Sequence, residues 1–428
     1  MYVKPKKTSD KLDSRQKSYL KKVFGIKSIK DLNEKILKQL KESLKDLNDT
    51  RQKGKIGYKI WDIVVCVIVS VLCGKHSWEE IEDFVNEKYD FFKKFLKMTG
   101  GVPSYKIYKR VMAIIDYKEL EKILLLFFDN ITKDILDGIN ILSFDGRVSN
   151  GSKRNKTIKN DKINPLNMLN VYSTKDQLCI ASRMIDSKTN EIPTMEKLLG
   201  ELYIKDCIIT NDALNTQKDT VAAVVEGFAD YVMPIKGNHP TFYKELQEYF
   251  DNKMQEYIIA GKPNTAYKKT YEYKNGFVIT YEYFQTTDIN WYQDKEDWKK
   301  LHSIGMKKKT IEKVDETKIE YQYYISSLFI NIDLFAKVIR YEWQVENKLH
   351  WHLDVTFRQD KNKTVDKNAL ANLEIVNKFC LGILNRIKKN YNNISLKRIM
   401  GILAADIESN FPQLIAFLVL SNGFNSSK

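Results

Sequence analysis

Three acidic residues stand where an α/β protein would place reactive carboxylates. Asp145 follows the apolar run ILSF and precedes Gly146, and Asp212 follows the run CIITN. Glu346 belongs to a long helical pattern far downstream. Ligands of α/β sheets bind at the carboxyl ends of the strands. The sequence therefore predicts that the two aspartates meet at one sheet edge, with Glu346 on a covering helix.

Carboxylates grouped in this way would form a cage of hard oxygen ligands for divalent cations. Mg²⁺ prefers a few carboxylates together with water and phosphate oxygens. Two ions about 4 Å apart can activate a water or a 3′-hydroxyl for in-line displacement at phosphorus. Taken one at a time, each residue also has an ordinary interpretation: Asp-Gly is typical of a turn, Asn-Asp-Ala of a helix N-cap, and a helical glutamate usually faces water.

The charge balance indicates a polyanionic partner. The 428 residues include 70 Lys and Arg against 55 Asp and Glu, a formal net charge of +15. A surplus of this size favours nucleic acid, with an anionic membrane surface as the second choice. Residues 1–30 hold ten basic and two acidic residues, which fits either a solvated tail or an arm that follows a phosphate backbone.

The composition excludes several other classes of protein. Hydrophobic residues make up 43% and charged residues 29%, as in soluble globular proteins. The most apolar run, Ile63–Cys73, is much shorter than the roughly 20 residues of a membrane span. No apolar segment follows the basic N-terminus, and five scattered cysteines form no CxxC pair. We expect neither a secretory signal nor a disulfide framework or zinc knuckle, and therefore a soluble intracellular protein.

Helical periodicity runs from about residue 35 to residue 125. A buried helix in GYKIWDIVVCVIVSVLCG is predicted to end at Gly74, and Ser77 with Glu80 forms a capping box for the next helix. Ser104 can cap a further helix. The basic residues of that helix, which could lie on DNA or simply face water, are Lys106, Lys109 and Arg110.

From Ile139 onwards the pattern predicts a mixed α/β sheet. An apolar run that ends in a turn after Asp145 is followed by the strands NMLNVYST and QLCIASRMID. Helix EIPTMEKLLGEL, strand DCIITND, helix TQKDTVAAVVEG and strand DYVMPIKGN come next. From about 241 to 320 the chain becomes β-rich, with a hairpin signal at Asn275-Gly276. The last predicted elements are the strand YQYYISSL, the helix that contains Glu346 and the amphipathic helix LANLEIVNKFCLGILNRIKKN.

The order of several motifs resembles that of the insertion-sequence transposases of the H-repeat-associated type, a DDE group with an RNase-H-like catalytic fold. The matching segments are SFDGRVSNGSKRN, IITNDALNTQKDTVAAVVEGFADYVMPIKGNHPTFY, and YYISSL followed by IRYEWQVENKLHWHLDVTFRQD. GYKIWDI, GKHSW and VPSYKIYKRV resemble the associated N-terminal domain of that group. The resemblance extends from about Leu47 to Leu384.

This resemblance implies a catalytic and metal-binding triad of Asp145, Asp212 and Glu346. The activity implied is Mg²⁺-dependent cleavage at the ends of the element, followed by attack of the freed 3′-hydroxyl on target DNA. We expect two metal ions, with Mn²⁺ as a substitute. The expected partners are double-stranded DNA and a second copy of the chain in the active complex. The expected location is the bacterial cytoplasm, at the nucleoid.

Two domains are expected on the same basis. Residues 1–135 would form a basic arm and a helical DNA-binding domain, and residues 136–428 an RNase-H-like catalytic domain with a β-rich insertion at about 241–320. A nuclease of the same fold that cuts without strand transfer, and an inactive DNA-binding descendant, are the alternatives.

Motif residues around the triad are expected to contact DNA or to support the site. These are Lys236 and Asn238 in the KGN turn, and Arg340, Asn347 and Lys348 around Glu346. Two positions depart from the family pattern: Glu342 stands where we expect His, and His239 where we expect Gln. His350 and His352 are two positions apart on a helix, so they point to different faces and are not expected to share a zinc ion.

Overall fold

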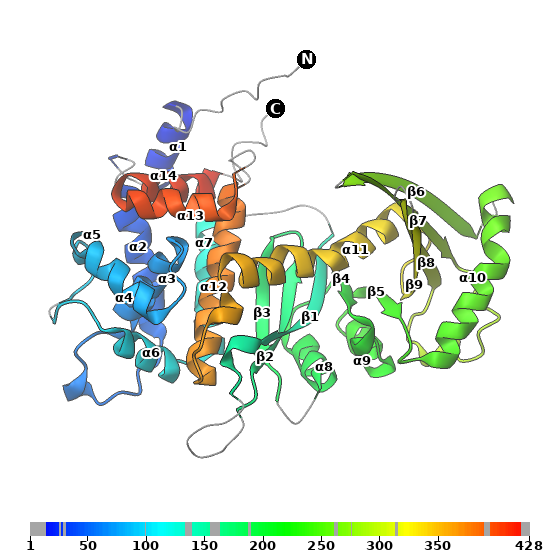
Figure 1. Cartoon of the computed structure of the whole chain (residues 1–428), viewed down its shortest axis with the longest axis horizontal. Coiled ribbons are helices and arrows are strands. Elements are labelled where there is room, and N and C mark those ends of the chain that lie inside the picture. The colour runs from blue at the N-terminus through cyan, green and yellow to red at the C-terminus, as the bar shows by residue number, and fades with distance from the viewer. Residues whose placement is uncertain are drawn as a thin grey trace.

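The computed structural model describes residues 14–24, 27–28, 31–98, 100–132, 139–154, 163–186, 190–260, 264–274, 276–312, 316–388 and 394–420. Helices from both ends of the chain gather at one end of the molecule, and a nine-stranded mixed sheet extends away from them (Figure 1). Of the expected basic arm, residues 1–13 lie outside the described residues, and helix α1 (Ser14–Phe24) makes up much of the rest.

Helices dominate the first part of the chain, as predicted. They are α2 (Asp31–Ser43), α3 (Ile60–Leu72), α4 (Trp78–Glu87), α5 (Tyr89–Lys93), α6 (Tyr105–Ile114) and α7 (Tyr117–Thr132). The stop at Gly74 is confirmed, because its φ of +78° is the left-handed conformation that favours glycine. The capping box of Ser77 and Glu80 is also confirmed. Ser104 stands at the N-cap of α6 but makes no capping hydrogen bond; the Glu82 carboxylate accepts from the backbone N–H of Tyr105 instead, at 2.7 Å.

The sheet has the strand order β3-β2-β1-β4-β5-β9-β8-β7-β6. The first five strands are β1 (Ile141–Ser149), β2 (Leu166–Ser173), β3 (Leu178–Met184), β4 (Ile208–Asn211) and β5 (Asp230–Ile235). β1, β2 and β3 pair antiparallel, whereas β4 pairs parallel with both β1 and β5. Helices α8 (Glu191–Glu201) and α9 (Lys218–Glu226) connect the later strands and pack on one face.

The β-rich segment continues this sheet. Helix α10 (Pro240–Ala260), which the sequence pattern did not predict, comes first and packs on the same face as α8 and α9. The four strands that follow are β6 (Thr265–Lys274), β7 (Phe277–Thr286), β8 (Ser303–Glu312) and β9 (Thr317–Ser326). β9 pairs antiparallel with β5. The predicted hairpin joins β6 to β7, and Gly276 in its turn has a φ of +82°.

The opposite face of the sheet is covered by the helices that end the chain. α11 (Ile332–Gln344) continues into the π-helical turns η6 (Val345–His350) and η7 (His352–Thr356). α12 (Lys367–Lys388) packs on the sheet and also on α3, α6 and α7, and α13 (Leu396–Ala405) and α14 (Ile407–Leu420) complete the helical end (Figure 1). The N-terminal and C-terminal helices therefore share one apolar core.

Among the described residues, no helix is both long and apolar enough to cross a bilayer. The five cysteines are free thiols; four are buried and Cys207 is half-buried.

Close packing of α11 on the sheet gives a stability prediction. A Cβ atom at Gly305 of β8 would lie 2.1 Å from the Phe335 ring of α11 and 2.8 Å from the Phe284 carbonyl oxygen. Gly305→Ala should therefore lower the free energy of unfolding by about 1–3 kcal/mol, measured by urea denaturation. Gly200→Ala is the control, because it lies in a helix with no atom near the added methyl group, and it should be neutral or stabilising.

Candidate active site

The pairing of β1 with β4 brings the two aspartates together. Phe144 is paired in parallel register with Asn211, so Asp145 and Asp212 each follow directly after a paired position. Neighbouring strands lie about 4.8 Å apart, and residues at matching positions share a face of the sheet. Ile141 and Ile208, at earlier positions of the same parity, pack against α11. Asp145 and Asp212 therefore share the face that α11 covers.

The prediction that Asp145 ends its strand is wrong. β1 continues to Ser149, and Gly146 pairs with Leu169 of β2. The neighbouring β4 is the strand that ends, at Asn211. Asp145 becomes accessible because its parallel neighbour stops, whereas its antiparallel neighbour continues.

Asp212 is held at the beginning of a short 3₁₀ turn, as predicted for an N-cap. Its carboxylate accepts a hydrogen bond from the backbone N–H of Asn215 at 3.0 Å. The Asn238 amide donates to the Ala213 carbonyl at 2.7 Å. His239 contacts the Thr216 carbonyl through Nε2, also at 2.7 Å. The KGN turn therefore approaches the site by supporting the turn that carries Asp212.

Glu346 lies just beyond α11, in the first residues of η6, and its side chain is exposed. Its negative charge acts on Asp145, as does that of Asp212. The structure thus places both Asp212 and Glu346 within electrostatic range of Asp145. Among the residues that the structure describes, no three His, Cys, Asp or Glu side chains are arranged as a metal-ion site.

The pKa of Asp145 depends on its burial and on the nearby carboxylates. Burial raises the pKa of Asp145 to about 7, and the negative charges of Asp212, Glu191 and Glu346 contribute to the rise. Both effects disfavour the ionised form of an acid. A divalent cation bound beside these carboxylates would relieve their repulsion and favour the ionised form of Asp145.

Glu191, which begins α8, was not predicted as a site residue. A Cβ atom on Gly146 would lie 1.9 Å from the Glu191 carboxylate, so the glycine leaves the space that this side chain fills. The same carboxylate accepts from the Asn215 amide at 2.9 Å. Glu191 therefore bridges the strand of Asp145 and the turn of Asp212. The glycine after Asp145 indicates a close approach by another group, but the sequence does not show which residue makes that approach.

His350 is the second residue that was missed. Its Nδ1 lies 3.3 Å from Oδ2 of Asp145. Burial, followed by the charges of Arg147 and Lys378, lowers the pKa of His350 to about 3. His352 contacts the Thr356 hydroxyl instead. The two histidines therefore point to different surroundings, as predicted.

Comparison with known proteins decides the family. Residues 41–128 match the family model described as DDE_Tnp_1-associated. The H repeat-associated putative transposase YbfD of Escherichia coli K12 is 31% identical over 218 residues, which are 51% of this chain and 83% of YbfD. The chain belongs to the H-repeat-associated transposase family.

Two other similar proteins also carry transposase names. Putative transposase YncI of Escherichia coli O157:H7 is 28% identical over 366 residues, 85% of this chain and 91% of YncI. Inactive transposase YbfQ of Escherichia coli K12 is 35% identical over 77 residues, 18% of this chain and 92% of YbfQ. The transposase family thus covers most of the chain.

At Glu342, where the chain departs from the expected family pattern, the carboxylate lies in a polar group between α11 and the sheet. Burial raises the pKa of Glu342 to about 7, while the positive charges of Lys307 and Lys236 and the nearby Tyr324 hydroxyl oppose the rise. Lys307 is 5% exposed, and its Nζ donates to Gln322 at 2.8 Å. Glu342 therefore faces a lysine of the β-rich segment.

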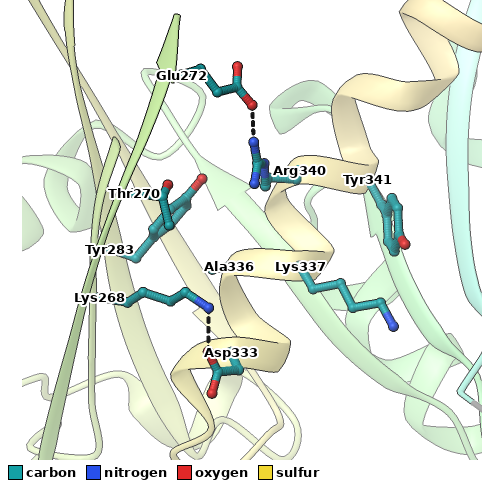
Figure 2. A pocket seen from close by; sticks show the side chains of 9 residues that line it. All are labelled: Lys268, Thr270, Glu272, Tyr283, Asp333, Ala336, Lys337, Arg340 and Tyr341. Atoms are coloured by element: carbon teal, nitrogen blue, oxygen red, sulfur yellow. Dashed lines mark hydrogen bonds and ion pairs between the residues drawn. The ribbon is translucent and has the colours of Figure 1, made fainter. Parts of the chain in front are cut away.

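Arg340 of the same helix lines a groove of about 540 Å³ between α11 and strands β6 and β7. Figure 2 shows its guanidinium directed at Glu272, with a second ion pair between Lys268 and Asp333. Asn347 donates to the Trp343 carbonyl at 2.9 Å, and Lys348 is exposed. Arg340 is thus engaged with the β-rich segment.

The remaining predicted DNA-contacting residues are on α6 and in the KGN turn. Lys106 and Arg110 are exposed, Lys109 is half-buried, and Lys236 is exposed. Since Glu82 occupies the N–H of Tyr105, the first turn of α6 already has an anionic partner. The exposed cations of α6, rather than its N-terminus, are therefore available to an anionic partner.

The raised pKa of Asp145 gives a pH prediction. The folded protein binds this proton more tightly than the unfolded chain, so the stability contributed by the neutral acid is lost as pH rises from about 4 through about 7. In EDTA, Asp145→Asn should match the wild type near pH 4 and be more stable by about 2 kcal/mol at pH 8, because solvent screens part of the shift. Thermal melts across this range measure the effect; a difference that does not change with pH would contradict it.

Proposed function

We propose that the chain is a DDE-type DNA transposase that cleaves DNA at the ends of its element and transfers the 3′-hydroxyl to target DNA with Mg²⁺. The observation that carries this proposal is the placement of Asp145 and Asp212 on neighbouring parallel strands, with Glu346 near enough for its charge to act on Asp145. Family membership supports the reaction class. The net charge of +15 supports a polyanionic substrate.

An RNase-H-like catalytic core is the fold that we infer for this function. Its support is the antiparallel meander of β1, β2 and β3, followed by β4 and β5 parallel to β1 and by α11 across the face. The β-rich segment extends that sheet through β9. The division at residues 135 and 136, and the pairing of two copies in the active complex, stay predictions.

Asp145, Asp212 and Glu346 would hold two Mg²⁺ ions, or Mn²⁺ in their place. When bound, these ions supply activation of the attacking oxygen and stabilisation of the leaving oxygen at phosphorus. The chain supplies the geometry: β1 fixes the backbone of Asp145, and the Asn215 N–H fixes the Asp212 carboxylate at 3.0 Å. Exposure leaves Glu346 accessible from solvent, where a DNA strand would enter.

Contacts to DNA are proposed for the exposed cations around the site and on α6. Lys236 extends from the turn next to Asp212, and Lys348 follows Glu346 closely. Asn238 would support the site from the protein side, because it holds the turn that carries Asp212. Arg340 would instead hold α11 against the β-rich segment through Glu272. The basic residues of α6 would lie on the flanking duplex.

The inactive descendant and the nuclease without strand transfer make different predictions from a transposase. Retention of all three carboxylates favours an active enzyme over the inactive form. Glu342 does not argue against activity, because its carboxylate contacts Tyr324 and faces Lys307. Joining of the cut end to a second DNA separates a transposase from a nuclease.

Substitution of Asp212 tests the catalytic proposal. Asp212→Asn keeps an oxygen that can accept from the Asn215 N–H but removes the charge. We expect Mg²⁺-dependent cleavage and strand transfer on plasmid DNA carrying the gene's own flanks to fall by at least about a hundredfold, while the affinity for that DNA is unchanged.

Asp219→Asn is the control, because this exposed carboxylate of α9 is not among the charges that act on Asp145. Cleavage by the Asp212→Asn variant at the wild-type rate would contradict the assignment of Asp212 as a catalytic residue. Binding without any cleavage by the wild type, in Mg²⁺ or Mn²⁺, would favour the inactive descendant.

Replacement of cations on α6 tests the DNA-binding proposal. Each phosphate contact contributes about −0.9 to the slope of log affinity against log salt concentration. Lys106→Gln with Arg110→Gln should therefore reduce the steepness of that slope by about two. The matched control is Lys197→Gln with Lys205→Gln, which removes two exposed charges near α8; an equal effect of both pairs would show that α6 has no special role.

A further inference from the structure

A row of polar side chains crosses the sheet beside the proposed site. Asp145 of β1 is paired with Asn170 of β2, and Asn170 with Ser182 of β3. Paired residues share a face. Asn170 and Ser182 are completely buried, although a sheet face under a helix is normally apolar. Burying such groups is unfavourable unless they are hydrogen-bonded, so their partners define the role of the row.

Lys378 of α12 provides the first partner. Its side chain is 3% exposed, and its Nζ donates to Oδ1 of Asn170 at 2.6 Å and to the Ser182 hydroxyl at 3.0 Å. The Glu374 carboxylate lies 3.8 Å from the ammonium group, and the charge of Lys378 also acts on the buried Glu121. The buried lysine is therefore both hydrogen-bonded and compensated.

The hydrogen-bonding capacity of Lys378 determines how the Asn170 amide and the His350 ring are oriented. An ammonium group only donates hydrogen bonds, so Asn170 must present its oxygen to Lys378 and its Nδ2 to the other side. On that side Nδ2 lies 3.4 Å from Nε2 of His350. Since an amide NH₂ only donates, Nε2 must accept. A neutral imidazole then carries its proton on Nδ1, the nitrogen 3.3 Å from Asp145.

We propose that His350 is a positioning residue for Asp145, and that Lys378, acting through Asn170, selects the imidazole tautomer that donates from Nδ1. This inference rests on the proposed function, since it assigns the orientation of one carboxylate of the proposed metal site. Hydrogen bonds from surrounding residues orient metal ligands, and their loss costs about 10–100-fold in metal affinity or activity. His350 follows Glu346 within the same helical turns, so this contact also relates the two carboxylates to each other.

The tautomer can be measured directly in the wild-type protein. With ¹⁵N-labelled histidine, long-range ¹H–¹⁵N spectra distinguish a protonated ring nitrogen from an unprotonated one, and His350→Asn assigns the signal. We expect His350 to carry its proton on Nδ1 alone. Lys378→Met should release the Asn170 amide and shift the signal towards the other tautomer. A proton on Nε2 in the wild type would overturn the proposal, whatever the variants do.

Metal affinity then separates positioning from packing. Mn²⁺ binding to the full chain, followed by the EPR signal of free Mn²⁺, should weaken about 10–100-fold in His350→Leu. His350→Asn should recover most of the affinity, because its amide NH₂ can donate to Asp145 where Nδ1 did. A purely packing role predicts the reverse, since leucine suits an apolar site better than asparagine. Equal affinities of the wild type and His350→Leu would refute positioning.

His352→Leu is the matched control, because His352 contacts Thr356 rather than the carboxylates, and its Mn²⁺ affinity should equal that of the wild type. Failure of the proposed function is distinguishable from failure of this inference. If wild type and Asp212→Asn bind Mn²⁺ equally poorly, the metal site is wrong, while the tautomer measurement still decides whether Lys378 and Asn170 control His350.

Discussion

Two parallel strands in register hold Asp145 and Asp212 side by side against the repulsion of their charges. Phe144 and Asn211 are the last pair of that register, and both strands are anchored by apolar contacts on the two faces of the sheet. Burial raises the pKa of Asp145, and the repulsion by Asp212, Glu191 and Glu346 adds to that rise. Packing energy distributed over the sheet and its helices thus maintains a local arrangement that its own electrostatics oppose.

The surroundings of this pair are polar on both faces. On one side Glu191 fills the space above Gly146 and is tied to Asn215. On the other, His350, Asn170 and Lys378 follow one another from the site into the core. Asp145 and Asp212 therefore lie among polar groups that are themselves hydrogen-bonded, and the Asn215 N–H orients the Asp212 carboxylate.

Local sequence rules predicted the features that depend on local physics. The stop at Gly74, the capping box at Ser77 and the hairpin before Gly276 each depend on a few adjacent residues, and all three are confirmed. The position of Asp212 after its strand was predictable for the same reason. The error at Asp145 has a different cause. A strand end cannot be located from one strand when its two neighbours end at different places.

Partners that are distant in the chain could not be predicted. Glu191 and His350 meet Asp145 only through the fold, and neither has a spacing that marks it. Ser104 shows the same limit on a smaller scale, since a glutamate from another helix replaces its capping bond. The family resemblance supplied the triad, but the residues that orient the triad depend on tertiary packing.

The shared helical core also bears on the order of synthesis. α3, α6 and α7 are translated early, yet one of the surfaces that they pack against belongs to α12, which leaves the ribosome only after the whole sheet. The first helices must therefore keep an apolar surface uncovered while most of the chain is being made, a condition that favours chaperone binding or aggregation. Completion of the amino-terminal region is thus coupled to completion of the carboxyl end, and a truncated copy of the gene would lose both.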